Sequence, residues 1–196
     1  MYRLKICSTF ILLLLFGKTF PNNNLIVSYS DRTKPIPTKF RDINGNVHQT
    51  RNKVFVFMDV ECPISQFYTK SLQKLSIKYA MVGVIFITVF PTKYVNENEI
   101  ISFNHKYNLT IPSVLDKFQN ITKKLNASVT PEVFVVNQNN EISYYGSIDD
   151  SYFALGKRNL NPKKNYLEDA LNSIIKNQKP LISHSNAIGC EIQRIP

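Results

Sequence analysis

Hydrophobic residues along this chain follow two patterns, continuous apolar runs and runs with a helical spacing. Residues 54–58 and 82–90 are continuous apolar runs rich in β-branched and aromatic side chains, which is typical of strands covered on both faces. Apolar residues that recur every three or four positions predict amphipathic helices at 64–79, 99–107 and 166–175. Strands that alternate with helices indicate βαβ units and a sheet that is at least partly parallel.

Shorter elements are expected between these segments. Asn44-Gly45 lies between apolar positions, which predicts a hairpin ahead of the first long strand. The other short elements are a strand at 111–116, a helix at 121–127, and strands at 133–136 and 142–145 joined by a turn. The predicted fold class is therefore α/β, with a central mixed sheet, an N-terminal hairpin extension, antiparallel edge strands and flanking helices.

The predicted domain organisation has four parts: a signal peptide or N-terminal anchor at 1–20, a linker at 21–38, a folded domain at 39–178 and a tail at 179–196. Arg3 and Lys5 precede the apolar run 10–16, as in an export signal. That run is shorter than the roughly 20 residues that span a bilayer, and no small-x-small cleavage site follows it. Cleavage and retention as a membrane-associated anchor therefore both stay open, and we expect an exported, periplasmic or extracytoplasmic protein.

Composition narrows the function classes. The chain has 196 residues, 43% of them hydrophobic, and a formal charge of +10, which fits one globular domain. Beyond the first twenty residues, 21 positive and 14 negative charges remain without any block of like charge, so we expect a solvated lysine-rich surface and no nucleic-acid partner. The sequence has no Cys-x-x-Cys pair for zinc and no phosphate-binding glycine loop, so we expect no cofactor and no metal.

Cysteine supplies the candidate chemistry. Of the three cysteines, Cys7 falls in the predicted signal, which leaves Cys62 and Cys190 in a compartment that permits disulfides. Cys62 follows a buried strand and precedes a helix. The free N–H groups and the dipole of a helix N-terminus favour a thiolate. The alternative interpretation of Cys62 is a buried structural cysteine.

The order of these features resembles the thioredoxin fold and, more narrowly, redoxin-domain proteins of the peroxiredoxin-like and thiol–disulfide oxidoreductase group. The resemblance covers roughly residues 38–176. Four segments carry it: the Asn44-Gly45 hairpin, Cys62-Pro63-Ile64-Ser65 at the strand-to-helix junction, residues 129–136 and residues 144–150. In this fold a cis-proline begins the strand that faces the reactive cysteine, and Pro131 matches that position.

The resemblance implies a role for each site residue. Cys62 would be the nucleophile that forms a mixed disulfide with substrate. Pro63, Thr130 and Pro131 would contact an extended substrate. Ser65 stands where a thioredoxin-type site has its second cysteine, so a trapped mixed disulfide has no local resolving thiol. The Ser65 hydroxyl can still bind the Cys62 thiolate.

Cys190 is the candidate resolving thiol. It lies in a tail expected to have little regular structure, which would let it swing toward Cys62. A static Cys62–Cys190 disulfide, an idle Cys190 and an external resolving thiol stay open as alternatives.

Two departures from the peroxiredoxin pattern separate disulfide exchange from peroxide reduction. Asp59 stands where peroxiredoxins carry a threonine, and Glu61 adjoins Cys62. We expect these acids to raise the pKa of the Cys62 thiol, which favours disulfide exchange over peroxide reduction. The resemblance to peroxiredoxins still implies an antioxidant role. The expected partners are a protein or small-molecule disulfide, or a peroxide, together with an external thiol reductant.

The alternative function is a non-catalytic binding module or a copper chaperone. Cys62, Cys190 and His184 would then supply thiolate and imidazole to Cu(I). The close cysteine pair typical of exported thioredoxin-like copper chaperones is missing.

Overall fold

A computed structural model describes residues 36–49 and 51–195 of the chain. The predicted signal or anchor, Cys7 and nearly all of the predicted linker lie outside the described residues. Among the described residues, no helix is long and apolar enough to cross a membrane.

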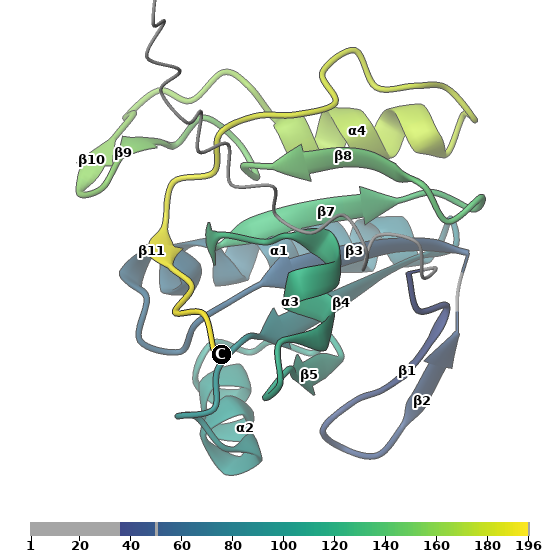
Figure 1. Ribbon diagram of the computed structural model, residues 1–196. Helices are drawn as coiled ribbons and strands as arrows, with labels where there is room; N and C mark the ends of the chain where they lie inside the picture. Colours follow the sequence, from purple (N-terminus) through teal and green to yellow (C-terminus); the bar gives the residue numbers. More distant parts are fainter. Residues whose placement is uncertain (1–35, 50, 196) are drawn as a thin grey trace, which may run out of the picture. The chain divides into compact units, whose positions relative to one another are not determined.

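The centre of the fold is a five-stranded mixed sheet (Figure 1). Its strands in chain order are β3 (Asn52–Phe57), β4 (Val84–Phe90), β5 (Ser113–Leu115), β7 (Glu132–Val136) and β8 (Ile142–Gly146). Their spatial order is β5-β4-β3-β7-β8. β4 runs parallel to β3 and β5, whereas β7 runs antiparallel to β3 and β8. The predicted mixed sheet with an antiparallel edge hairpin is confirmed.

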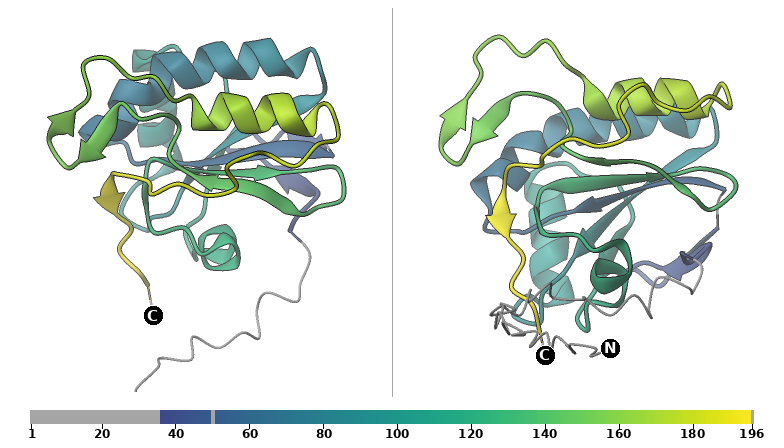
Figure 2. Two further views of the ribbon diagram at one scale, coloured as in Figure 1. Left: turned by 90° about the horizontal axis from the view of Figure 1, so that it is seen from above. Right: turned by 45° about the horizontal axis from the view of Figure 1, so that its top comes forward.

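Helices cover both faces of this sheet, as Figure 2 shows for α1, α4 and α3. The helices are α1 (Pro63–Ala80), α2 (Glu97–Lys106), α3 (Asn120–Leu125) and α4 (Tyr166–Ile174). Side chains of α1, α2 and α4 pack with Val54 and Val56 in one apolar cluster, while Leu125 of α3 packs with Phe55 and Phe57 in a second. Successive residues of a strand face opposite sides, so a strand buried on both faces needs the continuous apolar run seen here.

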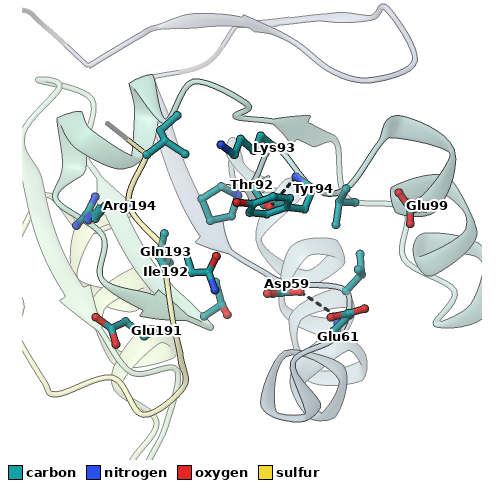
Figure 3. A pocket seen from close by; sticks show the side chains of 15 residues that line it. Asp59, Glu61, Thr92, Lys93, Tyr94, Glu99, Glu191, Ile192, Gln193 and Arg194 are labelled. Carbon is teal, nitrogen blue, oxygen red and sulfur yellow. Dashed lines mark hydrogen bonds between the residues drawn. The ribbon is translucent and has the colours of Figure 1, made fainter.

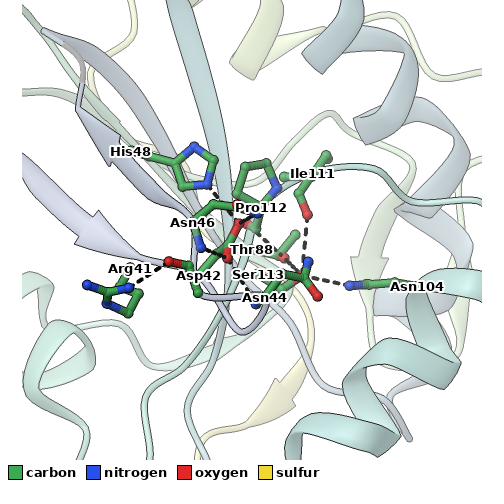
Figure 4. A network of polar contacts seen from close by, with 11 residues as sticks. Arg41, Asp42, Asn44, Asn46, His48, Thr88, Asn104, Ile111, Pro112 and Ser113 are labelled. Atoms are coloured by element: carbon green, nitrogen blue, oxygen red, sulfur yellow. Dashed lines mark hydrogen bonds and ion pairs between the residues drawn. The ribbon is translucent and has the colours of Figure 1, made fainter.

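A hairpin precedes the sheet, formed by β1 (Lys39–Arg41) and β2 (Val47–Gln49). Its turn contains Gly45 at φ +82°, a conformation that glycine adopts without steric cost. The Asp42 carboxylate accepts hydrogen bonds from the Asn46 backbone N–H at 2.9 Å and from His48 Nε2 at 2.8 Å (Figure 4). Burial would raise the pKa of Asp42, but these hydrogen bonds outweigh burial and hold it below its ordinary value.

Hydrogen bonds connect the hairpin to the edge of the sheet. The backbone N–H of Ile43 donates to the Ser113 carbonyl of β5 at 2.9 Å. The Ser113 hydroxyl in turn lies 2.8 Å from Thr88 Oγ1 of β4 and 2.8 Å from Asn104 Nδ2 of α2 (Figure 4). These contacts explain why polar side chains are buried at this edge.

Three features differ from the sequence-based prediction. A hairpin of β9 (Tyr152–Ala154) and β10 (Lys157–Arg158) was not predicted, because strands of two or three residues carry no periodicity. In α2, Ile100 and Phe103 are buried but Ile101, expected on the apolar stripe, is exposed. The tail is also more ordered than predicted, since β11 (Cys190–Glu191) pairs with β6 (Val129–Thr130).

Candidate functional site

Cys62 is the N-cap residue of α1, at the end of the loop that leaves β3. Pro63 follows at the first helical position, where its missing N–H and fixed φ suit a helix start. The first turn of α1 carries no acidic residue, so nothing on the helix itself offsets the positive end of its dipole. The Cys62 residue is buried, with 2% of its surface exposed.

Thr130 and Pro131 face Cys62 from the start of β7. The Thr130–Pro131 peptide bond is cis, as the resemblance predicts. The Cys62 thiol donates to the Thr130 carbonyl, with Sγ and O 3.1 Å apart. Two segments separated by 68 positions in the sequence therefore meet at one sulfur atom.

Cys190 lies on the other side of Thr130. In the antiparallel pairing of β11 with β6, Cys190 is opposite Thr130 and Glu191 is opposite Val129. The sulfur atoms of Cys190 and Cys62 are 2.6 Å apart, and both residues are free thiols. Cys190 thus sits beside Cys62 on a paired strand, which corrects the expectation of a loose tail that must swing toward the site.

The two thiols differ in acidity. Burial would raise the pKa of Cys62, but hydrogen bonds from the Cys190 thiol and from Ser65 outweigh burial and hold the pKa below its ordinary value. The pKa of Cys190 is raised to about 12 by burial, by its hydrogen bond to Cys62 and by the negative charges of the Cys62 thiolate and Asp59. Cys62 is therefore the thiol that ionises first, and Cys190 is its proton-bearing neighbour.

Ser65 and Asp59 act on this pair in different ways. Ser65 is fully buried, and its hydroxyl accepts a hydrogen bond from the Asp59 backbone N–H at 3.3 Å. Both the backbone N–H and the hydroxyl of Ser65 help to lower the pKa of Cys62. The pKa of Cys62 is lowered, against the expectation that Asp59 and Glu61 raise it, and the charge of Asp59 raises the pKa of Cys190.

Close packing fixes the tail beside the site. A Cβ atom on Gly189 would lie 2.1 Å from the Thr130 carbonyl oxygen, so only glycine fits there. Ile192 is buried, and its N–H donates to the Ser128 carbonyl at 2.9 Å. The Gln119 side chain donates to the Gln193 carbonyl at 2.6 Å and accepts from the Ile195 N–H at 3.1 Å.

Gln119, Gly189 and Ile192 were not among the predicted site residues. For Gly189 and Ile192, the sequence contains one signal that could have identified them. Ile188, Cys190 and Ile192 alternate with other residues, which is the period of a strand, and Gly189 lies within that alternation. Gln119 lies 74 positions before Gln193 and has no local signal of this kind.

A polar cavity of about 360 Å³ opens beside the cysteine pair (Figure 3). Its walls come mainly from the loop before Cys62, the loop after β4 and the chain from Glu191 onward, and its charged side chains include Asp59, Glu61, Lys93 and Arg194. Pro131 also lines a second, smaller pocket, together with Tyr68 of α1, Tyr152 of β9 and Ile188 of the tail. The sequence neighbours of both cysteines thus line these two pockets.

The histidine considered for copper lies elsewhere. His184 packs on Tyr145, with ring centroids 4.4 Å apart, and forms a β-bridge with it at the edge of β8. Within residues 36–49 and 51–195, no group of three or more histidine, cysteine or acidic residues could hold a metal ion. Cys62, Cys190 and His184 therefore do not form a three-ligand copper site.

Comparison with known proteins supports the fold. No protein-family model and no curated protein matches the chain. A hypothetical protein from Sinorhizobium meliloti and an uncharacterized conserved protein from Geobacillus kaustophilus are each 20% identical, with TM-scores of 0.69 and 0.71. Each alignment covers 83% of this chain, and 93% and 92% of the respective relatives. StoA from Bacillus subtilis is 21% identical over 57% of this chain and 89% of its own, with a TM-score of 0.50.

At these identities the comparisons concern the fold. Together with the strand order and the cis-proline opposite Cys62, they establish a thioredoxin-like fold. The sequence-based fold prediction is thereby confirmed.

Proposed function

We propose that this protein is an exported thiol–disulfide oxidoreductase in which Cys62 is the nucleophile and Cys190 the resolving thiol. The observation that carries the proposal is the placement of the two sulfur atoms 2.6 Å apart, one at a helix N-terminus and one on a strand paired beside the cis-proline. Export rests on the predicted N-terminal signal. The same site could act as a reductase or an oxidase, depending on the thiols that meet it.

In the reductive direction, the Cys62 thiolate attacks one sulfur of a substrate disulfide. The substrate S–S bond breaks, a Cys62–substrate disulfide forms, and the released substrate thiolate takes up a proton. Cys190 then loses its proton and attacks the Cys62 sulfur, which expels the second substrate thiol. The substrate has gained two electrons and two protons, and the protein holds a Cys62–Cys190 disulfide that an external dithiol reduces.

The acidity of Cys190 suits this sequence of steps. Burial raises the pKa of Cys190 first, but its hydrogen bond to Cys62 and the charge of the Cys62 thiolate add to the rise. The negative charge disappears once Cys62 is in a mixed disulfide, so Cys190 becomes easier to ionise when its attack is due. In the resting state Cys190 stays protonated and donates to the Cys62 sulfur.

The test is trapping of the mixed disulfide. The chain without its predicted signal is reduced and mixed with glutathione disulfide or a peptide disulfide. The native pair should release both substrate thiols and end as an intramolecular disulfide. Cys190→Ser should stop at a stable Cys62–substrate adduct, detectable by intact mass.

Cys62→Ser should release no substrate thiol by this route. Turnover that survives in Cys62→Ser, or a Cys190→Ser variant that turns over at the native rate without an added thiol, would contradict the proposal. Hydrogen peroxide in place of the disulfide tests peroxide reduction in the same assay, with sulfenic acid on Cys62 as its product.

A further inference from the structure

The position of β11 has a consequence for substrate entry. The family resemblance implies that Thr130 and Pro131 contact an extended substrate, yet residues 190–191 already pair with β6 at this place. Cys62 is 2% exposed with the tail in position, so the sulfur of a polypeptide disulfide has no path to it. The tail therefore holds the place of a substrate strand and presents its own cysteine to Cys62.

We infer that the groove along β6 binds an extended polypeptide segment with a reactive cysteine, in competition with the chain's own residues 188–192. In the preferred segment, a glycine directly precedes the cysteine and a branched aliphatic residue follows two positions after it. This inference rests on the proposed function and specifies its substrate class. We derive the residue preferences of the groove from the tail residues that occupy it.

The preference for glycine comes from backbone crowding. A Cβ atom at position 189 would lie 2.1 Å from the Thr130 carbonyl oxygen and 2.5 Å from its carbonyl carbon. These are backbone atoms of the cis-proline segment, and the Thr130 carbonyl also accepts from the Cys62 thiol. A substrate strand that brings its cysteine to the same register meets the same oxygen with its preceding residue.

The aliphatic preference comes from the pocket that Ile192 fills. Ile192 is 5% exposed and packs in the cluster that contains Phe57, Phe134 and Leu125. Its backbone N–H is also paired, with the Ser128 carbonyl at 2.9 Å. By contrast, Glu191 is exposed, so the position directly after the cysteine carries no comparable requirement.

Entry of a substrate requires release of residues 188–195. Upstream of them the tail is anchored independently. The Tyr145 N–H donates to the Ser183 carbonyl at 3.1 Å, and the Ser185 hydroxyl lies 2.6 Å from the Tyr144 hydroxyl. The released segment therefore stays tethered at the edge of β8, and Cys190 returns to Cys62 as the covalently held substrate strand leaves the groove.

The experiment uses the reduced chain with Cys190→Ser, so that adducts on Cys62 persist. The probe is the peptide Ala-Ile-Gly-Cys-Glu-Ile-Gln with its cysteine in a disulfide to thionitrobenzoate. Attack by the Cys62 thiolate on the peptide sulfur releases coloured thionitrobenzoate and leaves the peptide on Cys62, as mass spectrometry would show. Two further peptides carry alanine in place of the glycine or of the second isoleucine.

Loss of a few buried carbons, or one steric clash, typically changes discrimination by about tenfold or more, so each altered peptide should react at least about tenfold more slowly. Adding Gly189→Ala to the protein should displace the tail and accelerate the parent peptide, by about tenfold if the free groove was open for a tenth of the time. Glu191→Ala is the matched control and should leave the rate unchanged. Ile192→Ala is a second tail-releasing variant in case Gly189→Ala impairs folding.

Equal rates for the three peptides would overturn the inference while leaving the proposed function intact. No acceleration by either tail-releasing variant would overturn the competition between tail and substrate. Failure of every variant to react with both the peptides and a small aromatic disulfide would instead overturn the proposed function.

Discussion

At the scale of single residues, the site consists of two thiols made unequal by their neighbours. Cys62 receives hydrogen bonds from the Cys190 thiol and from the first turn of α1, whereas Cys190 is partly buried beside the Cys62 sulfur and the charge of Asp59. The negative charge therefore settles on the buried sulfur at the helix N-terminus. In exchange chemistry the sulfur with the lower pKa is also the better leaving group.

Replacing Cys190 by alanine should raise the pKa of Cys62. The substitution removes the Cys190 thiol, whose hydrogen bond is the first of the contributions that lower this pKa. The pH series of iodoacetamide alkylation should therefore show its midpoint at higher pH than in the native protein. At any pH below the midpoint, a tenfold smaller thiolate fraction corresponds to about 1.4 kcal/mol of lost thiolate stabilisation.

Cys190→Ser is the matched control for that series, because its hydroxyl keeps a donor in place, and its midpoint should lie between the other two. The midpoint of the pH series reports the pKa of Cys62. Better access of iodoacetamide to Cys62 after the loss of a side chain would alter only the plateau rate. An unchanged midpoint in Cys190→Ala would show that Cys190 does not stabilise the thiolate.

Ser65→Ala should also raise the pKa of Cys62, and in addition it should destabilise the fold. The Ser65 hydroxyl is fully buried and accepts from the Asp59 N–H at 3.3 Å. A buried donor left without its partner costs about 1–3 kcal/mol. Urea unfolding measures the stability and alkylation the acidity. Asp59→Asn, which keeps the backbone N–H, is the control that should leave the pKa of Cys62 low.

At the scale of elements, the decisive feature is β11, a strand of two residues. It exists because Thr130, 60 positions away, offers a free strand edge. Ile192 then inserts into the cluster beneath α3. Because the chain before it is anchored separately at Tyr145, this segment can open while the sheet stays folded.

Ile192→Ala should accelerate this local opening. Removing a buried isoleucine typically costs about 2–5 kcal/mol, so amide exchange at residues 190–192 should speed up by about thirtyfold or more in the reduced protein. The amides of β3 report global unfolding, so they should lose some protection as well but stay far better protected than residues 190–192. Ile182→Ala, an exposed position earlier in the tail, is the control. The same free energy of opening at residues 190–192 as in β3 would show that the tail and the sheet unfold together.

The sequence predicts elements that have a local pattern, but it does not predict contacts between distant segments such as β11 and β6. β3, β4, α1 and α4 follow from local apolar patterns, and Cys62 stands out by its place between two of them. The strand β11 has a faint alternation of its own but no local signal for its partner. The proximity of Cys190 to Cys62 depends on pairing with β6, and the effect of Asp59 on Cys190 depends on that same proximity. Local apolar patterns could therefore not predict these two properties, because both depend on pairing between distant strands.

At the scale of the whole domain, the cysteine pair links the helix that follows the first central strand to the end of the chain. The sheet between them is assembled from non-local pairings of β3 with β4 and β7. A covalent link between Cys62 and Cys190 would close a loop of 128 positions that contains β4 and β7, while β3 lies just before the loop.

The oxidised protein should therefore be more stable than the reduced one. For a loop of this length the chain-entropy model gives about 5 kcal/mol, and measured disulfides typically give about 2–4 kcal/mol. Urea unfolding of the native chain, with and without a strong reductant, should show a higher midpoint for the oxidised form. Cys190→Ala should unfold at one midpoint in both conditions. A native protein whose midpoint ignores reductant, although mass analysis shows the disulfide formed, would mean that the bond strains the fold by as much as it restricts the unfolded chain.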